Sequence, residues 1–290
     1  MDFQNLRAFI KVAETASFSH AAQELHLTQP AVSKRVALLE EELGAQLFDR
    51  IGRKVGLTEA GRALLPHARA VEQQLADAAQ SVRDLAGDVA GNLRLATSHH
   101  IGLHRLPPVL SRFSRDYPAV HLDIDFMDSE QAYDQILQGK AELAVVTLAP
   151  DQEPSIIARE IWRDPLDILV AKDHDMAKRK TVTLDLLADH AAILPGLNTY
   201  TGQIVKRLFD QRGLTLQVSM VTNYLETIRM MASVGLGWTV LPSSMRDSSL
   251  AAVALEGLTM ERTLGCIHHR GRSLSRAAQA FTQSLDAFAD

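Results

Sequence analysis

The first 57 residues show apolar positions at helical spacing. A first helix is predicted from the apolar residues Leu6, Phe9, Ile10, Val12 and Ala13. Ser17 or Ser19 can cap a second helix, and Thr28 begins a third that ends at Gly44. Three short helices joined by tight turns are typical of a helix-turn-helix, which places the start of its last helix in the DNA major groove.

The start of the third helix carries groups that can read or grip DNA. These are Thr28, Gln29, Pro30, Ser33, Lys34 and Arg35. Glycines at 52 and 56 mark turns between short apolar stretches and predict a two-stranded wing. Its Arg50, Arg53 and Lys54 are expected to contact the DNA backbone or the minor groove. Cations and anions are equal in number through Leu57, so charge and periodicity alone leave an ordinary three-helix scaffold open.

A long helix is predicted over residues 58–85. Its apolar positions alternate at spacings of four and three, as in a heptad seam: Leu64, Ala68, Val71, Leu75, Ala78, Val82 and Leu85. The seam favours pairing with a second chain over packing on its own domain, because the other faces of the helix are polar. We therefore expect a DNA-binding domain over 1–57 and a linker and dimerisation helix over 58–88.

Strand and helix patterns alternate over residues 89–290, which predicts an α/β domain. Expected strands include 91–97, 120–126, 143–147, 168–171 and 238–241, and expected helices include 106–115, 203–211 and 274–288. Residues 223–226 have the spacing of a capping box. Repeated β-α units imply parallel sheets that bind ligands at the carboxyl ends of their strands, with a cleft between two halves.

Composition narrows the functional classes. The net charge of −5 requires any nucleic-acid contact to come from a local patch. The single cysteine, Cys266, fits a reducing cytosol. We find no export signal, no stretch apolar enough for a membrane helix and none of the common phosphate-loop, dinucleotide, metalloprotease or serine-hydrolase motifs. A cytoplasmic protein that is not an enzyme is expected.

Five blocks near the N-terminus resemble the LysR-type transcriptional regulators. They are residues 9–25 (FIKVAETASFSHAAQEL), 28–33 (TQPAVS), 38–44 (LLEEELG), 47–50 (LFDR) and 57–61 (LTEAG). The resemblance implies a winged helix-turn-helix in a bacterial regulator, with base contacts at Gln29, Pro30, Ser33 and Lys34 and a wing contact at Arg53. It also implies homodimers or homotetramers.

The resemblance extends to the C-terminal part of the chain. Residues 139–146 (GKAELAVV) and 234–242 (VGLGWTVLP) are similar to two family segments, although the family more often has Asp at Glu142 and a smaller residue at Trp238. A periplasmic-binding-protein-like effector domain is implied over 89–290. Subdomain I comprises 89–162 and 267–290, subdomain II comprises 163–266, and the chain crosses between them twice.

Polar residues at strand ends predict an effector site in the cleft. The candidates are Thr97, Ser98, His99, His100, Ser129, Thr147, Asn198, Thr199 and Thr201. Free N–H groups at helix starts, hydroxyls and protonated histidines suit a small anion. Plain helix capping is the alternative and is expected for Thr222 and Asn223, whereas the family places effector contacts at Ser98, Thr147 and Thr201.

His100 and His104 are spaced for one helix face, as metal ligands can be. No cysteine or acidic residue lies nearby in sequence, so we expect surface histidines, no metal and no cofactor. The resulting hypothesis is a DNA-binding regulator controlled by a small, anionic effector. A small-molecule enzyme or a solute-binding protein on the same two-lobed scaffold remains as the alternative.

Overall fold

The computed structural model describes residues 1–51, 54–84 and 89–290. Two predicted contact residues, Arg53 and Leu85, lie outside these ranges. The chain forms two compact units, Met1–Gly87 and Asp88–Asp290.

The N-terminal unit begins with three helices, as predicted. They are α1 (Phe3–Thr15), α2 (Phe18–Glu24) and α3 (Gln29–Leu43). The side chains of Asp2, Ser17 and Thr28 cap them by accepting backbone N–H groups, and Gly44 ends α3 in the left-handed conformation. Their apolar faces meet in one core around residues such as Phe9, Val12, Val32 and Leu39.

A two-stranded hairpin follows and confirms the predicted wing. Strands β1 (Phe48–Ile51) and β2 (Lys54–Leu57) pair antiparallel, with Phe48 opposite Leu57 and Ile51 opposite Lys54. Leu47 and Phe48 are buried in the core of the three helices, which anchors the hairpin at its base.

The long helix α4 spans Glu59–Asp84, and the Thr58 hydroxyl caps it by accepting from Gly61 N–H at 3.0 Å. The predicted heptad seam needs a correction. Ala68 is buried in the core of its own unit and Leu64 packs against the same core, so both already have intramolecular partners. The exposed part of the seam begins at Val71.

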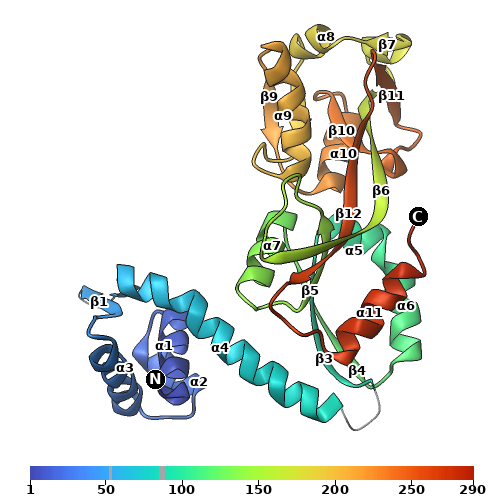
Figure 1. Ribbon diagram of the computed structural model, residues 1–290. Coiled ribbons are helices and arrows are strands. Elements are labelled where there is room, and N and C mark those ends of the chain that lie inside the picture. Colours follow the sequence, from blue (N-terminus) through green and yellow to red (C-terminus); the bar gives the residue numbers. More distant parts are fainter. Residues whose placement is uncertain (52–53, 85–88) are drawn as a thin grey trace. The chain divides into compact units, whose positions relative to one another are not determined.

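The second unit contains two groups of elements, here called lobe I and lobe II (Figure 1). Lobe I is built on β3 (Gly91–Thr97), β4 (Val120–Phe126) and β5 (Leu143–Thr147), which are parallel. Side chains alternate between its two faces. Leu93, Leu95 and Val145 pack with α6 (Leu106–Asp116) and α11 (Arg276–Asp286). Ala96 and Ala144 pack with α7 (Ser129–Leu137) on the other face.

Lobe II repeats this layering with shorter strands. It contains β7 (Thr181–Val182), β8 (Ala192–Leu194), β9 (Val218–Val221), β10 (Thr239–Pro242) and β11 (Leu250–Leu255). Helices α8 (Leu184–Ala188) and α9 (Tyr200–Arg212) cover one face around Trp238 and Phe209, and α10 (Leu225–Ser233) covers the other. Short 3-10 turns occupy Asp175–Lys178 and Ser243–Met245.

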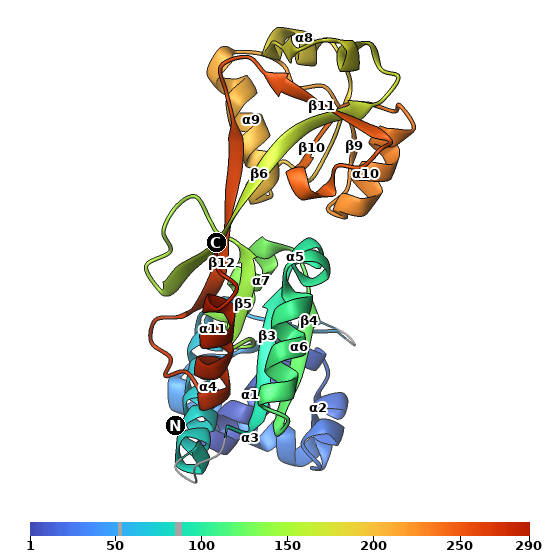
Figure 2. The ribbon, with the colours of Figure 1, turned by 90° about the vertical axis from the view of Figure 1, so that its right-hand side faces the viewer.

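Two long strands, β6 (Ile156–Ala171) and β12 (Met260–His269), run through both lobes (Figure 2). They are antiparallel to each other, and β12 is antiparallel to β5. The predicted parallel strands are present in each lobe, but they lie next to antiparallel crossing strands, so the sheets are mixed and not parallel throughout. A register shift lies between Leu264 and Gly265, where a Cβ would come within 2.3 Å of the Arg159 carbonyl oxygen.

One further local prediction was wrong. The helix α10 begins after Tyr224, which makes no side-chain cap, so residues 223–226 are not a capping box. The capping box is instead at Asp128 and Gln131, at the start of α7. The predicted class, an N-terminal winged helix-turn-helix followed by a two-lobed α/β domain, is confirmed. Within the described ranges, no helix is both long and apolar enough to cross a membrane.

Candidate functional site

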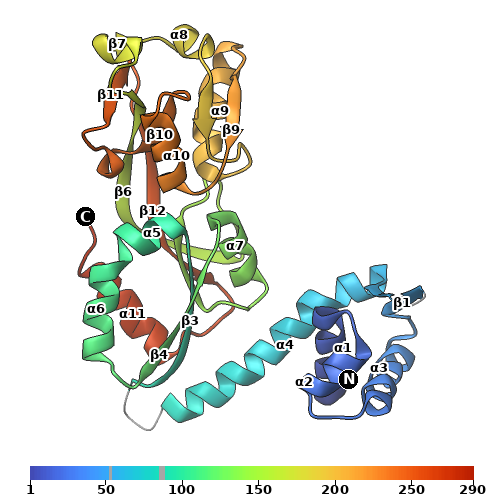
Figure 3. The ribbon, with the colours of Figure 1, turned by 180° about the vertical axis from the view of Figure 1, so that it is seen from behind.

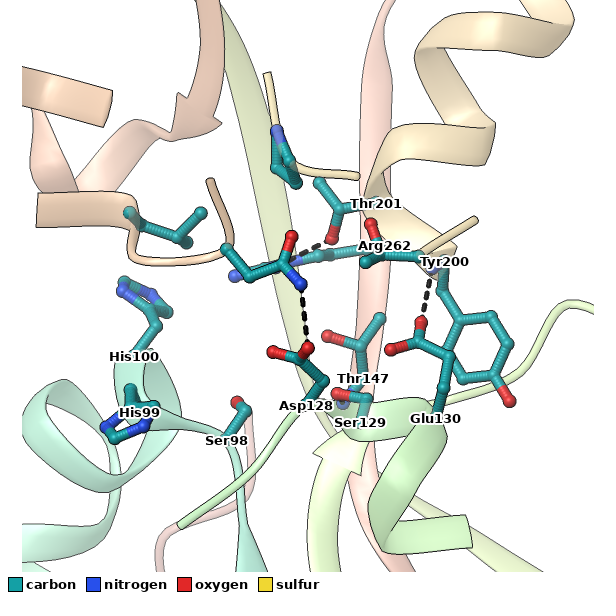
Figure 4. Close-up of a pocket in the computed structure, with 14 residues that line it drawn as sticks. Ser98, His99, His100, Asp128, Ser129, Glu130, Thr147, Tyr200, Thr201 and Arg262 are labelled. Carbon is teal, nitrogen blue, oxygen red and sulfur yellow. Dashed lines mark hydrogen bonds between the residues drawn. The ribbon is translucent and has the colours of Figure 1, made fainter. Parts of the chain in front are cut away.

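A pocket lies where lobe I and lobe II face each other (Figure 4). Its cavity is small and open to solvent, with a volume of about 50 Å³. The lining residues come from strand ends and helix starts of both lobes: Ser98, His99, His100, Asp128, Ser129, Glu130, Thr147, Pro195, Thr199, Tyr200, Thr201, Asn223, Leu225 and Arg262. Most of the sequence-predicted effector residues are thus brought together.

Lobe I contributes hydroxyl groups at the carboxyl ends of its strands. Ser98 follows β3 and is the N-cap of α5 (His99–His104), but its side chain makes no cap hydrogen bond. Ser129 begins α7, and its hydroxyl accepts from Thr147 N–H at 3.1 Å. Ser98 therefore has a hydroxyl group available to a ligand, whereas Ser129 fixes the end of β5.

A buried arginine, Arg262 of β12, lies at the centre of the pocket lining (Figure 4). Its Nε donates to Asp164 Oδ2 at 2.8 Å, and its Nη1 donates to Thr201 Oγ1 at 2.9 Å. Its Nη2 is buried and has no hydrogen-bond partner among the residues that the structure describes. A buried guanidinium N–H without a partner is costly, so this group is poised to bind an acceptor.

Two carboxylates of lobe I reach lobe II across the pocket. Asp128 Oδ2 accepts from Asn223 Nδ2 at 2.7 Å, and Glu130 Oε1 accepts from the backbone N–H of Tyr200 at the start of α9. Burial raises the pKa of the Glu130 carboxyl above its usual value. The N-terminus of α9 is therefore already occupied by a carboxylate of the protein itself.

Several predicted effector residues have other roles. Thr97 is buried outside the pocket lining, and its hydroxyl donates to the Val145 carbonyl at 2.8 Å. Asn198 is exposed and does not line the pocket. Thr199 does line it, but its hydroxyl caps α9 by accepting from Gly202 N–H and donates to the Gly196 carbonyl. Asn223, predicted to be a plain cap, instead joins the two lobes through Asp128.

Of the two adjacent histidines, both of which line the pocket, His100 differs from the prediction of a protonated group facing an anion. The ring of His99 packs against Phe126 and Tyr224, with centroids 5.5 and 5.0 Å apart. His100 is buried rather than exposed, and burial, with the charge of Arg262, lowers its pKa to about 4. His100 is therefore neutral near pH 7 and supplies no positive charge to an anion.

The sequence analysis missed Arg262, Asp164 and Glu130, and it did not assign Asp128 to the effector site. Arg262 and Asp164 lie on the crossing strands β12 and β6, in parts for which no strand was predicted. A signal was available at Asp128, because an acidic residue directly after a strand and before a helix commonly faces a ligand site.

The N-terminal unit carries the second candidate surface, at the start of α3. Gln29, Pro30 and Lys34 are exposed, and Gln29 Nε2 donates to Ser33 Oγ at 2.9 Å. Arg35 donates to Gln4 Oε1 at 3.2 Å, which ties it to α1. The hydroxyl of Thr28 caps the helix. Gln29 and Ser33 thus present a paired polar surface on one helical turn.

A helix-turn-helix with a wing, followed by a two-lobed α/β domain with a polar cleft, defines the class of ligand-responsive transcription regulators. Two family descriptions match the chain: "Bacterial regulatory helix-turn-helix protein, lysR family" over residues 3–62 and "LysR substrate binding domain" over residues 86–289. The chain belongs to the LysR family of transcriptional regulators.

Similar proteins agree with this assignment. An uncharacterised HTH-type transcriptional regulator of Azotobacter vinelandii is 64% identical over 108 residues, covering 37% of this chain and 75% of that protein. The RuBisCO operon transcriptional regulator of Allochromatium vinosum is 29% identical over 98% of this chain and 95% of its own length. Among solved structures, a full-length cysteine-to-aspartate variant of OxyR from Pseudomonas aeruginosa has a TM-score of 0.74 and 25% identity, with both chains fully covered.

Proposed function

We propose that the regulator responds to a small anion bound in the pocket between lobe I and lobe II. The observation that carries this proposal is the buried Nη2 of Arg262, which lines the pocket without a partner among the described residues. Its Nε donates to Asp164, so the Nη2 group remains available to an external acceptor. Charge-assisted hydrogen bonds of this type are stronger than neutral ones.

The other polar groups narrow the ligand further. Asp128 and Glu130 can only accept hydrogen bonds when ionised, and Ser98 can donate or accept. A ligand that carries one acidic group for Arg262 and hydroxyl groups for the carboxylates fits this lining. We therefore propose a small hydroxycarboxylic acid as the effector class.

Calorimetry tests this assignment after a thermal-shift screen of hydroxycarboxylic acids on the full chain, in buffer with a metal chelator. A ligand that binds only the native state raises its stability. Ser98→Ala and Thr201→Ala should weaken the ligand and leave effector-free DNA binding nearly intact. Ser114→Ala, an exposed position on α6, is the matched control and should bind as wild type. Unchanged affinity in both pocket variants would contradict the assignment.

We further propose that the unit over 1–57 reads DNA through the start of α3. Gln29 can pair with adenine, Ser33 supports it, and Lys34 suits a phosphate or guanine. Arg50, Arg53 and Lys54 of the wing segment are assigned to the backbone or minor groove. Gln29→Ala should cost about 1–3 kcal/mol on the cognate site and much less on random DNA. An equal loss on both sequences would exclude base reading.

The segment 58–88 is proposed to pair two chains. The exposed side chains Val71, Leu75 and Val82 support this role, because they continue the heptad seam with no core to cover them within the described part of their own unit. In the effector domain over 89–290, we assign residues 89–162 and 267–290 to subdomain I and 163–266 to subdomain II. Effector binding would close the two subdomains, change the angle between the paired chains and so alter their spacing on DNA, with a coupling of roughly 1–3 kcal/mol.

We infer that the protein acts by binding in the cytoplasm and does not turn over its ligand. The pocket lining contains Ser98 but, among the described residues, no histidine or carboxylate hydrogen-bonded to that hydroxyl to activate it. Cys266 is buried, and burial raises its pKa to about 12, which removes it as a nucleophile. Chemical conversion of the bound ligand by the purified chain would overturn this inference.

A further inference from the structure

Three side chains that can ligate a metal converge where α5 of lobe I meets α10 of lobe II. His100 and His104 are four residues apart on α5, and Glu226 lies in the first turn of α10. One possible ligand atom from each lies within 4.8 Å of the other two. Figure 3 shows α5 close to one end of α10.

His100 has an unusual environment for a buried imidazole. Its side chain is 4% exposed, yet neither ring nitrogen has a hydrogen-bond partner among the described residues. Its ring faces that of His104, with centroids 4.8 Å apart. Buried polar groups normally have hydrogen-bond partners, so the two ring nitrogens of His100 are available to a ligand.

The other two groups are already close together. His104 Nε2 lies 2.9 Å from Glu226 Oε1, and both side chains are partly exposed. Ion entry from solvent therefore requires no opening of a core. The contact between His104 and Glu226 alone could be an ordinary surface contact, but it does not account for the two unpartnered ring nitrogens of His100.

We propose that His100, His104 and Glu226 form a binding site for a divalent transition-metal ion of the zinc type. Two imidazole nitrogens and one carboxylate oxygen are a set that zinc uses in sites with a fourth, open position. Ligand atoms around tetrahedral zinc are about 3.4 Å apart, given bond lengths of about 2.0–2.1 Å. Side-chain rotations that move the outermost atoms by roughly 1 Å would close the present spacing.

The surrounding charges are compatible with a bound cation. Glu226 brings one negative charge, and Arg262, the arginine whose charge acts on His100, forms an ion pair with Asp164. Since His100 also lines the pocket, the open position of the ion would face the cleft. The ion would connect α5 to α10 and hold lobe I and lobe II together, a role separate from the proposed recognition of the anion by Arg262.

Titration of the full-length chain with Co²⁺, and then with Zn²⁺ as competitor, tests the site. The protein is purified without a polyhistidine tag, and no organic effector is present. We expect one tight site per chain, the visible absorption of four-coordinate Co²⁺, and its loss on adding Zn²⁺. His104→Ala and Glu226→Gln remove exposed groups and should each weaken binding by roughly 100-fold or more.

The control is His121→Ala, which removes an exposed histidine of β4 away from the cluster and should bind as wild type. Thermal melting without metal checks that each variant folds. The proposal is overturned if wild type shows only weak, six-coordinate Co²⁺ binding, or if either ligand variant binds as tightly as wild type. Because the titration contains no anion effector, its failure would leave the proposed effector site standing.

Discussion

Replacing Arg262 by methionine should destabilise the second compact unit, here called the effector unit, by about 3 kcal/mol. The substitution leaves the Asp164 carboxylate, whose side chain is 1% exposed, without its 2.8 Å partner. Removing one member of a buried ion pair typically costs about 3–5 kcal/mol. The lower end applies because Arg105 Nη2, 3.4 Å from Asp164, still offsets part of the buried charge.

The double variant Arg262→Met with Asp164→Leu separates stability from binding. It removes both charges, so most of the lost stability should return, with about 1 kcal/mol remaining for the hydrogen bond that Thr201 loses. Effector binding should be absent in both variants, because both lack the guanidinium. A double variant that regains stability but still fails to bind the effector would thus separate the role of Arg262 in stability from its role in binding.

Urea unfolding followed by tryptophan fluorescence measures this effect selectively. The only two tryptophans, Trp162 and Trp238, both lie in the effector unit and are buried there. The single variant should unfold at a urea concentration about 1 M lower than wild type. Arg159→Met, which breaks the exposed pair with Asp286, is the control and should cost less than about 1 kcal/mol. The reasoning fails if Arg262→Met unfolds with the control, or if the double variant is as unstable as the single one.

Three further outcomes are expected. The pKa of the Glu130 carboxyl is raised, so the folded state binds its proton more tightly than the unfolded chain does. The stability that this proton contributes is complete below pH 4.5 and is lost as the pH rises through the folded-state pKa. Glu130→Gln should remove this part of the pH dependence of the urea midpoint, and an unchanged pH profile would contradict the prediction. Cys266, with its pKa raised to about 12 by burial, should react with a thiol reagent only after the effector unit unfolds, as timed labelling in urea would record; rapid labelling of the native chain would disagree. Leu75→Asp places a charge in the proposed helix pair and should reduce the mass measured by light scattering, whereas an unchanged mass would exclude pairing through this seam.

The helical unit could be predicted closely because its signals are local. The spacing of Phe9 and Val12, the cap at Thr28 and the terminating Gly44 each depend on neighbours within a few residues. The sequence did not show which part of the long helix packs on its own unit and which part is exposed. Ala68 fits the heptad seam as well as Leu75 does, and only tertiary packing shows that Ala68 belongs to the core of its own unit.

The sequence predicted the location of the pocket and its hydroxyl groups, but not the charged side chains that line it. Ser98, Thr147 and Thr201 follow from the rule that ligands bind at strand ends and helix starts. The roles of Arg262 and Glu226 depend on contacts that are distant in sequence: Arg262 contacts Asp164 98 residues earlier, and Glu226 contacts His104 122 residues earlier. Periodicity along one segment carries no information about such distant partners. The alternation of buried and exposed positions in β6 is also irregular, which hid a strand of 16 residues.

The pairing of β6 with β12 gives the effector unit a modular construction. Trp162 lies opposite Leu264 and Arg163 opposite Thr263, so the chain leaves lobe I and returns to it on neighbouring strands. A whole lobe is thus inserted between two positions that a short hairpin turn would otherwise join. Lobe II can be exchanged for that of a relative, or lengthened by gene rearrangement, without reordering any strand of lobe I. Ligand specificity can therefore diversify by recombination at this junction while the part of the gene that encodes the helix-turn-helix stays the same.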